Sequence, residues 1–184
     1  MQTKHKIDYS DAMHIADSLL VLLAPACERV EIAGSLRRHR PQIGDIEIVA
    51  VPRYNVVYNL FGEPIQQDSL VNDILSQLQF KTIKSGPRFK QFEYQGIKVD
   101  LFLANETNWG VILALRTGSA DFSHWLVTPQ VQGGAMPAGM QCQGGYLRRH
   151  GKTLTTLEEQ DLFAHLGLEW ISPLEREVGL WNRL

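Results

Sequence analysis

Apolar and polar residues alternate along the chain with two periods, one helical and one extended. In Tyr9–Leu23, apolar residues recur at helical spacing, which predicts an amphipathic helix. In residues 45–51, DIEIVAV, the alternation is that of a half-buried strand. Further strands are expected at residues 29–33, 80–83, Phe89–Tyr94 and Ile97–Leu103, and further helices at residues 69–78, 109–116 and 121–126. The pattern predicts an α+β fold in which helices back a mixed or antiparallel sheet.

Two stretches lack a clear period. Residues 53–67 contain Gly62 and Pro64 and are interpreted as a loop. Glycine and proline concentrate in residues 129–145, so we place a boundary between a unit of residues 1–128 and a smaller unit of residues 129–184. In the smaller unit, a hairpin is expected around His150 and Gly151. A helix should follow it, beginning with a capping box of Thr156 and Glu159 and ending at Gly167.

Composition narrows the class of protein. Of the 184 residues, 44% are hydrophobic and 21% are charged, which fits a soluble globular domain and excludes a disordered or fibrous chain. The longest early apolar stretch, residues 19–26, is far shorter than the roughly 20 residues that a bilayer span needs. We therefore expect a cytoplasmic protein with no membrane partner. Cys27 and Cys142 lie far apart in the sequence and have no clustered ligands, so neither a disulfide framework nor a zinc site is indicated.

The charge balance bears on nucleic-acid binding. A net charge of −2 is unusual for a dedicated DNA binder, because phosphate contacts supply most non-specific affinity. Basic residues nevertheless gather in three groups: Arg29, Arg37, Arg38, Arg40 and Arg53; Lys81, Lys84, Arg88, Lys90 and Lys98; and Arg148, Arg149 and Lys152. These groups indicate either a local basic face or solvated strand faces.

Three carboxylates are the main candidates for chemistry. Asp45 and Glu47 are two positions apart in a predicted strand, so their side chains project from the same face. Asp100 lies between apolar residues of another predicted strand, where an acid is costly without a partner. If the two strands are adjacent, the three carboxylates converge and can hold two divalent cations for in-line phosphoryl or nucleotidyl displacement. The alternative for Asp100 is a structural salt bridge to Lys98 or Arg88.

A second candidate region precedes the carboxylates. Gly34 and Ser35 stand where a strand ends and a helix begins, so backbone N–H groups and the Ser35 hydroxyl could cradle a phosphate. Arg37 and Arg38 follow on the same helix. One of them, facing the cleft, could pair with a triphosphate through the forked guanidinium geometry.

Four motifs in this order resemble those of family X DNA polymerases, within the DNA polymerase beta superfamily of nucleotidyltransferases. They are residues 34–38 (GSLRR), 44–47 (GDIE), 99–102 (VDLF) and 117–119 (TGS). Residues 158–177 resemble the end of that family's thumb subdomain. The resemblance implies a nucleotidyltransferase palm followed by a small hairpin-and-helix thumb, as in the minimal members that some viruses encode and that act inside the host cell. Only about thirty residues precede Gly34, so we expect no lyase module.

The resemblance also implies a role for each motif residue. Asp45 and Glu47 would bind both of two Mg²⁺ ions, with Mn²⁺ as an alternative, and Asp100 would bind the catalytic ion. Gly34, Ser35 and Arg38 would contact the triphosphate. The sugar and base would be lined by Thr117, Gly118 and Ser119. The implied reaction adds a nucleoside monophosphate to a 3′ hydroxyl of a DNA primer or primer–template and releases pyrophosphate, and we expect a monomer.

Three departures from the family pattern affect these expectations. Glu47 stands where the family usually has Asp, so ligand reach and metal preference differ by one methylene. Leu115 and Arg116 replace the aromatic pair that crowds the sugar's 2′ position, which predicts weaker discrimination against ribonucleotides. Ser123 and Val127 replace residues that touch the minor groove of the new base pair.

Two other functions remain open from the sequence. The first is a nucleotidyltransferase acting on RNA, a protein side chain or a small molecule, because this fold hosts many acceptors. The net charge favours it slightly. The second is an inactive binding module that retains the fold, against which the intact carboxylate trio argues.

Overall fold

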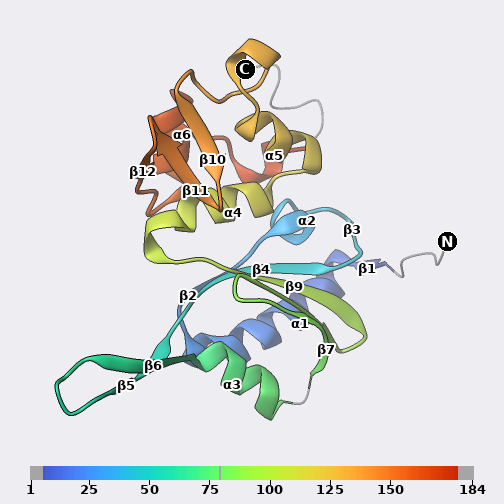
Figure 1. Cartoon of the computed structure of the whole chain (residues 1–184). Helices are drawn as coiled ribbons and strands as arrows, with labels where there is room; N and C mark the ends of the chain where they lie inside the picture. The colour runs from blue at the N-terminus through green and yellow to red at the C-terminus, as the bar shows by residue number, and fades with distance from the viewer. Residues whose placement is uncertain (1–5, 79, 178–184) are drawn as a thin grey trace.

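A mixed five-stranded sheet forms the centre of the N-terminal half (Figure 1). In this computed structural model, the structure describes residues 6–78 and 80–177. The strand order is β2-β4-β9-β8-β7, with β4 and β9 parallel and the other neighbours antiparallel. The strands are β2 Cys27–Ile32, β4 Ile46–Pro52, β9 Ile97–Leu103, β8 Phe89–Tyr94 and β7 Lys81–Ser85. The predicted α+β class and helix-backed sheet are therefore confirmed, and the sheet is mixed.

One face of this sheet packs on two helices, α1 (Tyr9–Leu23) and α3 (Leu70–Gln77), which lie below it in Figure 1. The helical spacing of Ala12, Ala16 and Leu19 places them on one stripe of α1, and all three are fully buried. They pack in one core with alternate residues of β4 and β9, including Ile48 and Val99. The short strands β1 (Ile7–Asp8) and β3 (Gln42–Ile43) pair beside this layer, and a 3₁₀ turn, Ala24–Ala26, ends α1.

The opposite face of the sheet carries the polar residues of β4 and β9. Above it lie the single-turn helix α2 (Gly34–Arg37) and the longer α4 (Trp109–Thr117), as Figure 1 shows. A 3₁₀ turn, Glu106–Asn108, precedes α4. Val49, Trp109 and Leu113 form a small core at this level. The candidate carboxylates lie on this same face, beside α2.

A second core lies in the C-terminal half. The elements of the predicted unit of residues 129–184 are β10 Met140–Gln143, β11 Tyr146–Arg149, β12 Lys152–Leu154 and α6 Glu159–Leu166, with 3₁₀ turns Gln130–Gln132 and Pro173–Glu175, whereas α5 Ala120–Val127 precedes that unit. The three strands form an antiparallel sheet in the order β10-β11-β12. Residues of α4, α5, α6 and this sheet share one core, which contains Phe122, Leu147 and Phe163. Residues 1–5, 79 and 178–184 of the two predicted units lie outside the described residues.

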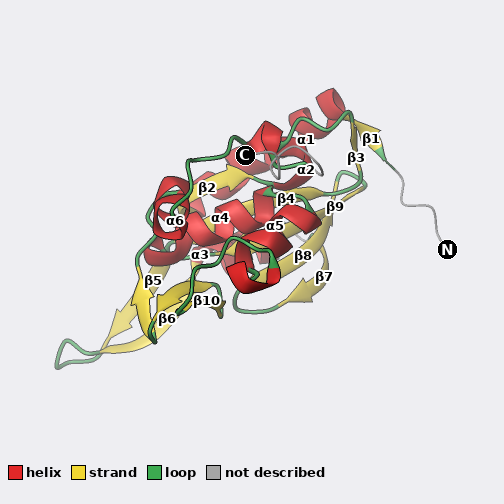
Figure 2. Cartoon of the chain, turned by 90° about the horizontal axis from the view of Figure 1, so that it is seen from above, coloured by secondary structure: helices red, strands yellow, loops and turns green. Residues whose placement is uncertain are grey.

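Three local predictions were wrong. Residues 53–67 are not a loop, because β5 (Tyr54–Tyr58) and β6 (Pro64–Ser69) form a hairpin that projects from the body (Figures 1 and 2). Its residues are exposed on both faces, so no period-two pattern marks it. β10 lies within the stretch of residues 129–145 that was interpreted as loop-rich. Helix α6 is capped by Glu158 and Asp161, not by Thr156 and Glu159, although it does end at Gly167 in a left-handed conformation.

Candidate active site

Glu47 and Asp100 lie directly opposite each other on the adjacent parallel strands β4 and β9. Asp45 immediately precedes β4, two positions before Glu47. All three side chains are half-buried, whereas their neighbours Ile46, Val99 and Leu101 are fully buried on the other face. The structure therefore places on one face of the sheet the three carboxylates that the sequence singled out.

Lys98 binds two of these carboxylates at once. Its Nζ lies 3.0 Å from Asp45 Oδ2 and 3.0 Å from Asp100 Oδ2. Burial alone would lower the pKa of Lys98, but the hydrogen bonds to the two carboxylates outweigh it, and the pKa is raised. Gln91 Nε2 donates to the other oxygen of Asp100, Oδ1, at 2.7 Å. The salt bridge considered for Asp100 is thus present, with Lys98 and not with Arg88 as its partner.

Glu47 is the carboxylate with the least compensated charge. Burial, together with the negative charges of Asp45 and Asp100, raises its pKa to about 7. Arg38 and Arg116 act in the opposite direction. A buried carboxylate beside two others is stabilised by added positive charge. This part of the face is therefore suited to a cation.

Gly34 is what allows Glu47 to occupy this position. A Cβ atom on residue 34 would lie 1.9 Å from Glu47 Oε2 and 2.9 Å from Glu47 Cβ, so no side chain fits there. Gly34 also has a φ of +63°, a left-handed conformation that favours glycine. The strand-to-helix break at Gly34 thus sets both the path of the chain and the place of the Glu47 carboxylate.

The carboxylates of Asp45, Glu47 and Asp100 are suitable ligands for a hard divalent cation, but their side chains do not converge on a single point. Within residues 6–78 and 80–177, no three His, Cys, Asp or Glu side chains form a group that could hold a metal ion. Lys98 supplies the positive charge between Asp45 and Asp100 instead. Carboxylate oxygens are the ligands that Mg²⁺ and Mn²⁺ prefer. Asp45, Glu47 and Asp100 could hold such an ion if the Lys98 ammonium moved aside.

Arg37 and Arg38 point in different directions, as expected for consecutive helical residues. Arg38 donates to the backbone oxygen of Thr117 at 2.6 Å and to Glu177 Oε1 at 2.6 Å, and its charge lowers the pKa of Glu47. Arg37 instead binds Glu159 through both terminal nitrogens, each at 2.9 Å. Ser35 lies half-buried in the same short helix. Of the two arginines, Arg38 is therefore the one near the carboxylates.

Thr117, Gly118 and Ser119 join α4 to α5. Thr117 is fully buried, and its hydroxyl accepts a hydrogen bond from Arg37 at 2.7 Å. Ser119 caps α5 by accepting from the Phe122 N–H, and its own N–H donates to the Arg176 backbone oxygen. The side chains of Thr117 and Ser119 are thus engaged in local structure, and so are the Thr117 backbone oxygen and the Gly118 and Ser119 N–H groups.

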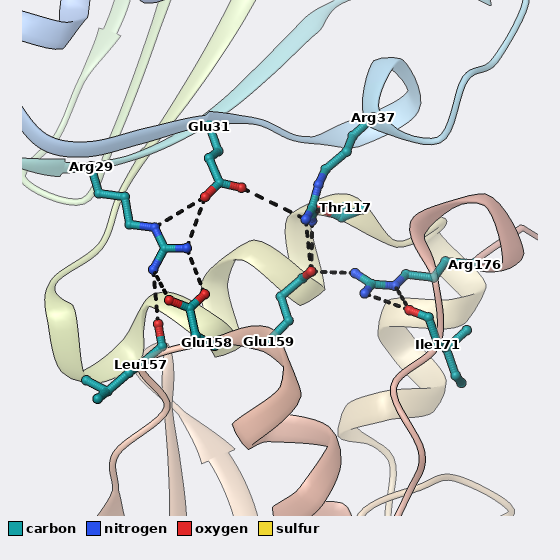
Figure 3. A network of polar contacts seen from close by, with 9 residues as sticks. All are labelled: Arg29, Glu31, Arg37, Thr117, Leu157, Glu158, Glu159, Ile171 and Arg176. Carbon is teal, nitrogen blue, oxygen red and sulfur yellow. Dashed lines mark hydrogen bonds and ion pairs between the residues drawn. The ribbon is translucent and has the colours of Figure 1, made fainter.

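A network of ion pairs holds the start of α6 against the sheet (Figure 3). Arg29 of β2 binds Glu158 at 2.6 Å, and Arg37 of α2 binds Glu159 at 2.9 Å. Arg176, which is fully buried, donates to the Glu159 carboxylate and to the Ile171 backbone oxygen. The hydrogen bonds from Arg176 and Arg37 outweigh burial and lower the pKa of Glu159. Consecutive glutamates of the C-terminal unit therefore each take an arginine from the N-terminal half.

Sequence reasoning assigned no site role to several residues that the structure brings to the carboxylates. Lys98 was considered only as a partner of Asp100, and Gln91 was not considered. Arg116 was noted only for the sugar, yet its guanidinium lies 4.0 Å from the centre of the Phe102 ring and its charge acts on Glu47. The i, i+2 spacing of Lys98, Asp100 and Phe102 on one strand face was the signal that could have found this group.

Comparison with known proteins adds no relative. No protein-family model matches the chain, and a search of curated proteins found no match to it. Among the described helices, none has the length and apolar character needed to cross a membrane. Function is therefore inferred from the residues of the site and the motifs they form.

Proposed function

We propose that the protein transfers a nucleoside monophosphate from a nucleoside triphosphate to a 3′ hydroxyl and releases pyrophosphate. The observation that supports this most is the arrangement of Asp45, Glu47 and Asp100 on one sheet face, with Glu47 and Asp100 opposite each other. These residues would hold two Mg²⁺ or Mn²⁺ ions. When bound, such ions lower the pKa of an attacking hydroxyl and neutralise charge on the leaving group.

Asp100 would take the proton. Gln91 holds its Oδ1, so the carboxylate would keep its orientation once the Lys98 ammonium has moved away from Oδ2. In the proposed reaction the 3′ oxygen bonds to the α-phosphorus while the bond from that phosphorus to pyrophosphate breaks. The hydroxyl proton passes to the Asp100 carboxylate and then to solvent.

Arg38 would bind the triphosphate. It lies close enough to Glu47 for its positive charge to oppose the rise in the pKa of that carboxyl, and it carries the planar donor fork that suits phosphate oxygens. Arg38 would exchange its bond to Glu177 for the more highly charged ligand. Ser35, in the turn between Gly34 and Arg38, would add a hydroxyl donor.

The acceptor that we propose is a DNA primer, which makes the chain a minimal polymerase similar to family X, with a palm and a small thumb. A second candidate is a nucleotidyltransferase with an RNA, protein or small-molecule acceptor. It is favoured by the pairing of Arg29, Arg37 and Arg38 with acidic residues, which leaves less positive charge for a phosphate backbone. In a third, non-catalytic candidate, Lys98 is the permanent counter-ion of Asp45 and Asp100.

One assay separates these candidates. The protein is incubated with labelled primer, with and without template, and with each ribo- and deoxyribonucleoside triphosphate in Mg²⁺ or Mn²⁺. Primer extension that is lost in Asp100→Asn and kept in Asp73→Asn, a change on the distant helix α3, supports the polymerase. Pyrophosphate release without extension, when other acceptors are supplied, supports the second candidate. No turnover and no Mn²⁺ binding with any acceptor would refute the transferase.

A further inference from the structure

The hairpin of β5 and β6 is the most exposed apolar structure in the described chain. It forms a two-stranded sheet of its own and projects from the body (Figures 1 and 2). Tyr58 of β5 is 60% exposed, and Leu60 and Phe61 in the turn are 101% and 90% exposed. Such a concentration of exposed apolar side chains on a single projection marks an interaction surface.

The two outer edges of this hairpin differ in character. Natural edge strands are usually protected against pairing by charge or proline. β6 contains Pro64 and Asp68, which protect its edge in this way. β5 reads YNVVY and contains neither a charged residue nor a proline, and its residues are β-branched or aromatic apart from Asn55. The edge of β5 is therefore the one open to another strand.

The two valines of β5 do not find apolar partners within their own hairpin. Val56 lies opposite Gln67, and Val57 lies opposite Gln66. Because cross-strand pairs stabilise a sheet when their side chains are complementary, β6 leaves the apolar side chains of β5 without matching neighbours. A strand on the other edge of β5 would provide them if it were itself apolar.

We infer that the missing strand is β5 of a second copy of this chain. YNVVY is nearly symmetric about Val56, so antiparallel pairing about a two-fold axis would place Val56 opposite the partner's Val56. Tyr54 would then lie opposite the partner's Tyr58. On the face that carries Val56, each strand therefore receives an apolar neighbour at position 56 and aromatic neighbours at positions 54 and 58, whereas Val57 lies opposite the partner's Asn55. The proposed dimer differs from the monomer expected from the sequence.

Sedimentation of the full chain from micromolar to hundreds of micromolar concentrations tests the inference. We expect the average mass to rise from 20.8 kDa toward twice that value. Val56→Lys places like charges opposite each other and should weaken dimerisation by about tenfold or more. Gln67→Lys adds the same charge on β6, opposite Val56 within the hairpin, and should leave the dimer intact. A monomer at every concentration, or a dimer that persists in Val56→Lys, would overturn the inference.

Mixing two variants tests the two-fold pairing itself. Val56→Lys and Val56→Glu should each be monomeric alone, and they should form a heterodimer when mixed, because residue 56 faces its own copy. Circular dichroism spectra like that of the wild type would show that both variants fold. Failure of the folded variants to associate on mixing would contradict the proposed register. The carboxylate residues are unchanged in both variants, so nucleotidyl transfer is an independent measurement.

Discussion

Gly34 and Glu47 are in contact, and the glutamate carboxylate occupies the space that any side chain at position 34 would need. The contact joins the first motif of the sequence to the second, because the Gly34 turn and the Glu47 strand determine each other's position. It also explains why a glycine stands there in terms of space as well as backbone conformation. A side chain at position 34 should therefore affect activity and stability through two separable causes.

Gly34→Ala should abolish nucleotidyl transfer, because the new methyl group displaces Glu47. The left-handed backbone adds a stability cost of about 1 kcal/mol. Gly151→Ala is the matched control, since Gly151 has a φ of +80° and a Cβ atom added there would meet nothing within 4 Å. We expect both variants to melt at a lower temperature and only Gly34→Ala to lose activity. Equal activity in the two variants would show that the place of Glu47 is not needed.

Asp100→Ala should reduce the rate of transfer by far more than tenfold. A tenfold reduction corresponds to about 1.4 kcal/mol in the activation barrier. Its fold should persist, because Lys98 keeps its ion pair with Asp45 after Asp100 is removed. Rate assays and thermal melts of the same preparation check both parts. If Asp100 serves only as a structural partner of Lys98, the melting temperature falls and the rate of the folded protein stays within tenfold of wild type.

Arg37→Ala and Arg38→Ala should differ in their effect on triphosphate affinity. Arg38→Ala should weaken triphosphate binding, because Arg38 acts electrostatically on Glu47. Arg37→Ala should leave triphosphate affinity unchanged and destabilise the fold by about 1–3 kcal/mol, because it removes a partner of the buried Glu159. Arg38→Ala should lose stability as well, because it removes the hydrogen bonds to Thr117 and Glu177. Triphosphate titration and denaturant unfolding of each variant provide the two readouts. Equal losses of affinity would count against the assignment of Arg38.

Much of the fold was predictable because burial on one face leaves a period. The ranges Tyr9–Leu23, Phe89–Tyr94 and Ile97–Leu103 are helices or strands with the predicted bounds. β5 and β6 were missed because exposure on both faces leaves no period. The pairing of Glu159 with Arg37 and Arg176 joins distant parts of the chain, and it overrides the local capping box that Thr156 and Glu159 suggested.

The candidate site, like the fold, has one part that local sequence spacing predicted and one part that it could not predict. The spacing of Asp45 and Glu47 fixes a shared face from local geometry alone. Their approach to Asp100 depends on parallel pairing of β4 and β9, which a single sequence could only suggest. The bridging position of Lys98 depends on both strands at once, so local pattern could not give it.

The ion pairs of Glu159 at the start of α6 should make the stability of the fold depend on pH. The folded-state pKa of Glu159 lies below its ordinary value, so its ionised form contributes stability above about pH 4.5 that is lost as pH falls through the folded pKa. Glu159→Gln should therefore be less stable than wild type at pH 7, and the difference should shrink below pH 4.5. Glu169→Gln, a change of an exposed glutamate in the same unit, should show little difference at either pH. A gap between Glu159→Gln and wild type that does not change with pH would refute the ionic role.

The last prediction concerns the choice of sugar, for which the structure changes the residue to test. Leu115 was expected to form part of the sugar wall, but it packs against the core of the C-terminal unit. Arg116 is the residue of the pair that reaches the site, where its guanidinium stacks on Phe102.

A long, flexible donor at position 116 obstructs a ribose hydroxyl less than an aromatic ring would. Loss of a wall of this kind should reduce discrimination against ribonucleotides by roughly one to two orders of magnitude, since shape alone rarely supplies more than a few kcal/mol. Arg116→Tyr should restore part of that discrimination, whereas Leu115→Met, a change within the core, should leave it unaltered. The measurement is the ratio of kcat/KM for matched deoxyribo- and ribonucleoside triphosphates in each variant. A strong preference for deoxyribose in the wild type that Arg116→Tyr does not change would assign the exclusion to the backbone at Thr117 instead.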